Sequence, residues 1–146
     1  MKVDMTTEAV IERPRAEVSS YAGDPTNAPQ WYSNIESVNW KTQPPIRVGS
    51  RMAFVARFLG RRLEYTYEIV ELVPGERLVM STAEGPFAME TTYAWHDSGP
   101  GRTRMTLRNR GEPQGFAAVT APVMAGAMRR ANLKDLARLK QILERR

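Results

Sequence analysis

The sequence predicts an α+β fold in which one long C-terminal helix covers an antiparallel sheet of seven strands. Three observations support this prediction. Residues 116–146 are the only long segment whose apolar side chains recur at the three- and four-residue spacing of a helix. Most of the preceding segments alternate apolar and polar side chains, as strands with one buried face do. The connections between successive segments are short, which favours antiparallel neighbours.

One strand and two short helices are predicted from the N-terminal residues. Residues 3–12 alternate apolar and polar side chains, and Arg13-Pro14 ends this strand. Proline suits the first turn of a helix, so a short helix is predicted at residues 16–22. A second short helix is predicted at residues 27–33, with Trp31 as its apolar anchor.

Six further strands are predicted after the short helices. They span residues 35–41, 51–59, 62–73, 76–84, 87–96 and 102–110. Proline and glycine separate them. Pro74-Gly75 is a strong turn signal, and the sequence DSGPG at residues 97–101 is typical of a tight hairpin. The alternation is plainest in the strand at residues 62–73, where Leu63 and Ile69 share the apolar face.

The long helix has two different halves. Its predicted inward face comprises Val123, Ala127, Ala131, Leu136, Leu139 and Leu143. Pro122 is strained inside a helix, so the helix either begins near residue 120 or bends there. The leucines of the second half require a dry core. The small residues of the first half, at residues 121–131, leave either a close backbone contact or an empty space.

Length and composition indicate one globular domain spanning residues 1–146. The net charge is +5, from 21 basic and 16 acidic residues, but the basic residues are spread along the chain, so we expect no nucleic-acid partner. No segment approaches the ~20 apolar residues of a membrane span, and residues 1–12 lack the apolar core of a signal peptide. We therefore expect no membrane insertion and a cytoplasmic location. A monomer and a homodimer are both compatible with the sequence.

The common catalytic and metal-binding arrangements are not supported. The only histidine, His96, stands beside Asp97 and Ser98 in a predicted turn, where adjacent residues cannot form a catalytic triad. We expect it to be exposed. One histidine and no cysteine leave too few preferred ligands for zinc, so we expect no metal site. No glycine-rich phosphate loop is present and no cofactor is expected. The catalytic residues, if any, are unknown.

The inward face of the predicted sheet is more informative. It combines bulky apolar side chains with a few polar ends, as the walls of ligand pockets do. The alternative is that these side chains simply fill the core. The candidate ligand-binding residues are Phe54, Tyr65, Tyr67, Met80, Met89, Thr91, Tyr93, Met105, Asn109, Val123, Met124 and Ala127. If the side chains of residues 51–59 have the reverse orientation, Arg57 enters the cavity and can bind a carboxylate or an enolate.

Several local patterns resemble a known superfamily. They are the Pro14 break before Glu17-Val18, the Asp24-Pro25 loop before Trp31, Val48-Gly49-Ser50-Arg51, the hairpin YEIVELVPGERL at residues 67–78, and the final helix at residues 135–144. With the element order β-α-α-β6-α, the chain resembles the helix-grip superfamily of START lipid-transfer domains, birch-pollen-allergen-like proteins and bacterial polyketide cyclase/dehydrase-like proteins. It is most similar to the bacterial branch.

The resemblance implies a curved sheet that wraps around the long helix, with an apolar cavity between them. It also implies binding of a hydrophobic or aromatic small molecule, lipid- or polyketide-like. One alternative is a polyketide cyclase, aromatase or dehydratase in which Tyr65, Tyr67, Tyr93 or Asn109 orients a carbonyl or relays a proton. Another is an interaction protein that uses its basic surface. If residues 121–131 border the cavity, Ala127→Leu should block ligand binding with little loss of stability.

Overall fold

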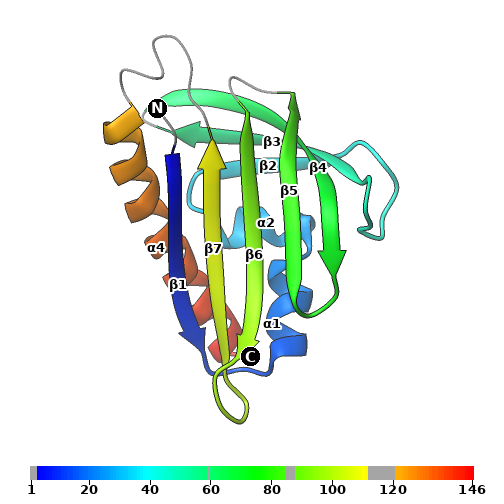
Figure 1. Ribbon diagram of the computed structural model, residues 1–146, viewed down its shortest axis with the longest axis vertical. Coiled ribbons are helices and arrows are strands. Elements are labelled where there is room, and N and C mark those ends of the chain that lie inside the picture. Colours follow the sequence, from blue (N-terminus) through cyan, green and yellow to red (C-terminus); the bar gives the residue numbers. More distant parts are fainter. Residues whose placement is uncertain (1–2, 59, 85–87, 112–120) are drawn as a thin grey trace.

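The computed structural model describes residues 3–58, 60–84, 88–111 and 121–146, and it confirms the predicted helix-grip α+β fold (Figure 1). In chain order the elements are β1 (Val3–Ile11), α1 (Arg15–Ala22), the 3-10 turn η1 (Pro25–Asn27), α2 (Ala28–Trp31), β2 (Ile35–Trp40), β3 (Arg51–Phe58), β4 (Arg61–Val73), β5 (Arg77–Glu84), β6 (Met89–Asp97), β7 (Thr103–Gly111) and α4 (Ala121–Glu144). The ends of the strands differ from the predicted ends by at most two residues.

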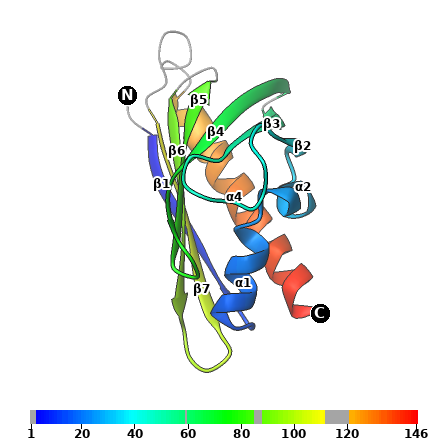
Figure 2. The ribbon, with the colours of Figure 1, turned by 90° about the vertical axis from the view of Figure 1, so that its right-hand side faces the viewer.

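The seven strands form one antiparallel sheet in the order β1-β7-β6-β5-β4-β3-β2. All three labelled helices lie on the same side of this sheet (Figure 2). The pairing of β4 with β5 shifts register twice, between Thr66 and Tyr67 and between Ile69 and Glu71. Such irregularities bend a strand and increase its twist, which lets the sheet curve around the helices.

Alternation along the strands gives the sheet one buried and one solvated face. In β6 and β7 the buried positions are Met89, Thr91, Tyr93, Trp95, Thr103, Met105, Leu107 and Asn109. Charged side chains of the outer face pair across strands. Asp4 bonds to Arg108 (2.7 Å), and Glu12 bonds to Arg102 (2.8 Å). Exposed pairs of this kind add little stability, so the sheet depends mainly on its buried face.

The helix α4 begins at Ala121, so Pro122 lies in its first turn, where a missing backbone N–H costs nothing. Residues 112–120, including the first part of the predicted helical segment, lie outside the described residues, as does Phe87 of the predicted strand at residues 87–96. The leucines of the second half of α4 are buried as predicted: Leu136, Leu139 and Leu143 all lie in the hydrophobic core.

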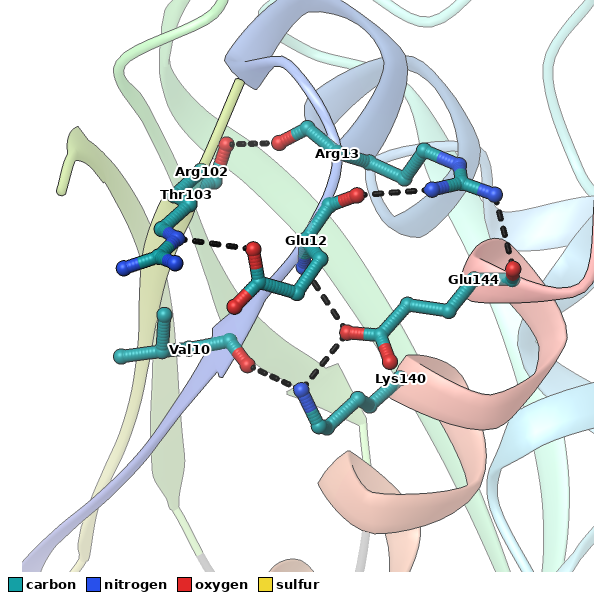
Figure 3. Close-up of polar contacts among 7 residues, drawn as sticks. All are labelled: Val10, Glu12, Arg13, Arg102, Thr103, Lys140 and Glu144. Atoms are coloured by element: carbon teal, nitrogen blue, oxygen red, sulfur yellow. Dashed lines mark hydrogen bonds and ion pairs between the residues drawn. The ribbon is translucent and has the colours of Figure 1, made fainter. Parts of the chain in front are cut away.

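Polar contacts fix the C-terminal end of α4 to the end of β1 (Figure 3). The carboxylate of Glu144 accepts hydrogen bonds from the backbone N–H of Glu12 (2.8 Å) and from Lys140 Nζ (2.6 Å). These bonds, with Lys140 first, hold the pKa of Glu144 below its ordinary value. Arg13 donates to the Glu144 carbonyl oxygen (2.7 Å), and Lys140 also donates to the Val10 carbonyl oxygen (2.8 Å). The helix is therefore anchored at the end farther from residues 121–131.

Candidate functional site

A cavity of about 130 Å³ lies between the inner face of the sheet and α4. Most of its wall consists of apolar and aromatic side chains. Eight of the candidate residues line it: Phe54, Tyr65, Tyr67, Met80, Met89, Thr91, Tyr93 and Asn109. They come from β3, β4, β5, β6 and β7, where side-chain alternation turns each of them towards α4.

Two polar side chains of the sheet meet in the cavity wall. Thr91 on β6 stands directly opposite Asn109 on β7, and its hydroxyl donates to Asn109 Oδ1 (3.0 Å). Tyr67 lies beside them. Its burial raises its pKa to about 12, and a hydrogen bond with Thr91 offsets only part of this effect. The Tyr67 phenol therefore stays protonated near neutral pH and can donate a hydrogen bond to a ligand.

Two tyrosines form a second polar pair. The hydroxyls of Tyr32, which caps the C-terminal end of α2, and Tyr93 are hydrogen-bonded to each other. Burial raises the pKa of both phenols above the ordinary value. Both rings pack against Trp31. The ring centroid of Trp31 lies 4.1 Å from that of Tyr32 and 5.8 Å from that of Tyr93. Trp31 is fully buried and does not line the cavity, so it serves as a packing anchor for α2.

Two residues of α4 carry buried polar atoms without a partner in the part of the chain that the structure describes. Asn132 is 6% exposed and lines the cavity, and its amide nitrogen Nδ2 has no acceptor. Asp135, one turn later, accepts a hydrogen bond from the Ser33 N–H through Oδ1 (2.9 Å), while Oδ2 has no donor. Unpaired buried polar atoms are rare. The Asn132 amide is thus a donor that a ligand oxygen can satisfy.

Eight cavity residues were not among the named ligand-binding candidates, although Met128 and Ala131 lie in the helix half that was expected to border the cavity: Tyr32, Asn34, Ile35, Ala56, Leu63, Met128, Ala131 and Asn132. Ala56 and Leu63 share the inward orientation of Phe54 and Tyr65, so the alternation already identified their face. Ala131 belongs to the predicted inward face of the long helix. For Asn34 and Ile35, just after α2, the sequence carries no signal.

Three candidates are placed elsewhere by the structure. Met105 is 0% exposed within the core, beside Trp95 on the neighbouring strand and away from the cavity. Val123 is 66% exposed, and Ala127 is half-buried but does not line the cavity. On α4 the cavity lining comprises Met128, Ala131 and Asn132, so it stops short of Val123 and Ala127. The side chain of Met124 lies outside the described residues.

Comparison with known proteins identifies the family. The family model described as "Polyketide cyclase / dehydrase and lipid transport" matches residues 2–144. The chain belongs to this polyketide cyclase/dehydrase and lipid transport family. A search of curated proteins found no match.

Solved structures show the same fold at low sequence identity. TTHA0849 from Thermus thermophilus is 20% identical, with a TM-score of 0.83 and 97% of each chain covered. The Zhui aromatase/cyclase from Streptomyces is 14% identical, with a TM-score of 0.86, covering 100% of this chain and 96% of the other. A START superfamily protein from Mycobacterium smegmatis is 13% identical, with a TM-score of 0.80, covering 95% of this chain and 98% of the other.

In this polyketide cyclase/dehydrase family member, the alternative side-chain orientation that would turn Arg57 into the cavity is wrong. Arg57 is exposed, and its Nε donates to Glu36 Oε1 (2.5 Å) on the outer side of the sheet.

His96 is exposed, as predicted. Within the described ranges, no group of three or more His, Cys, Asp or Glu side chains is placed to hold a metal ion. None of the described helices has the length and apolarity needed to cross a membrane.

Asp135→Asn is expected to make the protein more stable than wild type at pH 7. Burial raises the pKa of the Asp135 carboxyl above its ordinary value near 3.8, although the Ser33 bonds oppose this. A carboxyl whose pKa is higher in the folded state stabilises the fold below its unfolded pKa and loses that contribution as pH rises through its folded pKa. Asparagine keeps an acceptor for the Ser33 N–H and carries no charge.

The measurement is urea unfolding of both proteins from pH 3 to pH 7. The difference between their free energies of unfolding should be smallest at pH 3 and should grow with pH. A difference that does not change with pH would contradict this prediction.

Proposed function

We propose that this protein binds a hydrophobic or aromatic small molecule, lipid- or polyketide-like, in the cavity between the sheet and α4. The observation that carries the proposal is the composition of the cavity wall. Apolar side chains such as Phe54, Met80 and Met89 surround a few placed polar groups, which is the usual composition of a small-molecule site. The membership of a family described by polyketide cyclisation and lipid transport supports the same class of ligand.

The size of the cavity limits what it can hold without rearrangement. Its volume of about 130 Å³ is close to that of a ~150 Å³ apolar cavity that takes up benzene. A single aromatic ring therefore fits, whereas a fused polyketide or a lipid chain requires side chains to move. Met80, Met89 and Met128 suit such movement, because methionine is unbranched and adapts its shape to different ligands.

The polar groups favour binding and orientation over proton abstraction. The second function to weigh is cyclisation of a bound polyketide, because the Zhui aromatase/cyclase shares the fold. Tyr67 and Tyr93 can donate to a ligand carbonyl. Their raised pKa values make them poor general bases near neutral pH, since a base works best when its pKa lies near the operating pH. The Asn132 amide is likewise a donor. Binding is therefore the function that the described residues support best.

A thermal-shift panel of aromatic ketones, naphthols, fatty acids and sterols tests this function. A ligand present at 100 times its Kd should stabilise the fold by about 2.7 kcal/mol, which raises the Tm by roughly 5–10 °C for a chain of this size. The matched control is Ala131→Leu, which narrows the cavity and should reduce the shift by about half or more. If no member of the panel raised the Tm of the wild-type protein, we would abandon the proposal.

A further inference from the structure

The cavity has a neighbour on the molecular surface. A groove of about 510 Å³ lies where α2 packs against α4. Ser33, Lys134 and Arg138 are among the residues that line it. Tyr32 lines the groove and also lines the cavity, so the two spaces share this side chain as part of their walls. On α4, Asn132 borders the cavity and Asp135 borders the groove, one turn apart.

Tyr32 lies between the cavity and the groove. It is the residue that caps the end of α2, with an extended backbone (φ −80°, ψ 125°), and its ring packs against Trp31. Its hydroxyl is bonded to Tyr93 inside the cavity, and part of the residue is exposed. A ligand that bonds to Tyr93 can replace this contact and join the two spaces.

The residues that line the groove carry a net positive charge. Lys134 is exposed and lies close enough to Asp135 to favour the charged form of that carboxyl. Arg138 donates through Nε to the Gln30 carbonyl oxygen (2.5 Å), and within the described residues its two terminal nitrogens make no hydrogen bond that would compete with a ligand. Asp135 opposes an anion, but it is 1% exposed and already accepts the Ser33 N–H. Two cations outweigh this single carboxylate.

We propose that the cavity and the groove are two halves of one site for an amphipathic anion. The apolar body of the ligand lies in the cavity, Tyr32 turns aside, and a carboxylate lies in the groove between Lys134 and Arg138. This inference rests on the proposed function and specifies the class of ligand. It also explains how a cavity large enough for about one ring accommodates a longer molecule.

The test compares naphthalene-2-carboxylate with its neutral isostere naphthalene-2-carboxamide by isothermal titration calorimetry. Wild-type protein should bind the carboxylate about fivefold more tightly, as expected for two partly exposed ion pairs, and this preference should shrink at high salt. Lys134→Gln/Arg138→Gln should remove the preference while retaining carboxamide binding. The matched control Arg130→Gln/Arg145→Gln removes the same charge from two other exposed residues and should keep the preference.

The possible outcomes separate the inference from the proposed function. Equal affinity of wild type for the two compounds, or a preference that survives Lys134→Gln/Arg138→Gln, overturns the anion site and leaves binding in the cavity intact. Undiminished carboxylate binding by Ala131→Leu shows that the groove alone holds it, which overturns the two-part site. Failure of wild type to bind either compound overturns this inference, whereas the cavity proposal is decided by the thermal-shift panel.

Discussion

Leu139→Ala is expected to lower the free energy of unfolding by about 2–5 kcal/mol. Leu139 is 0% exposed, in the middle of the leucine stripe by which α4 contacts the core. Its truncation removes buried apolar surface and leaves a cavity that the anchored end of α4 cannot easily close, because Glu144 and Lys140 tie that end to β1. Urea unfolding followed by circular dichroism measures the change, with the m-value checked for two-state behaviour.

Leu133→Ala is the matched control, because it makes the same substitution on the same helix. Leu133 is 43% exposed and faces away from the leucine stripe. We expect its replacement to change the free energy of unfolding by no more than about 1 kcal/mol, as is usual for exposed positions. Similar losses for the two variants would mean that α4 does not rest on the sheet through the stripe that contains Leu139.

The fold could be predicted because its main signals are local. Each strand alternates between an apolar and a polar face, and proline or glycine marks most of the connections, so neither signal depends on distant residues. The short helix α2 is different. Its ends are set by distant partners, since Asp135 holds the Ser33 N–H and Arg138 holds the Gln30 carbonyl oxygen. The predicted helix at residues 27–33 was accordingly too long.

The boundary between cavity and core could not be predicted, because it depends on how α4 crosses the sheet. Met89 and Met105 are the same residue type on the same face of neighbouring strands, yet only Met89 lines the cavity. On α4, Asn132 continues the buried stripe, but a polar residue looks like a solvated position in a sequence. A search of the sequence for polar residues at the spacing of the leucine stripe would have found Asn132.

Ala131 lines the cavity and Ala127 does not, so Ala131 is the more informative position to substitute. Ala131→Leu is expected to weaken ligand binding at least tenfold, because the larger side chain enters a cavity of about 130 Å³. The free energy of unfolding should stay the same or increase, since the new side chain fills empty space and buries apolar surface. Calorimetric titration with naphthalene-2-carboxamide gives the affinity, and urea unfolding gives the stability.

Ala127→Leu is the control that makes this result specific. Ala127 lies on the same half of α4 and is half-buried, but it does not line the cavity, so this variant should bind the ligand as wild type does. In a filled core the extra methylene groups of Ala131→Leu would cost about 1–3 kcal/mol through overpacking. Destabilisation on that scale, or unchanged affinity in Ala131→Leu, would mean that the space beside Ala131 is packing rather than a binding site.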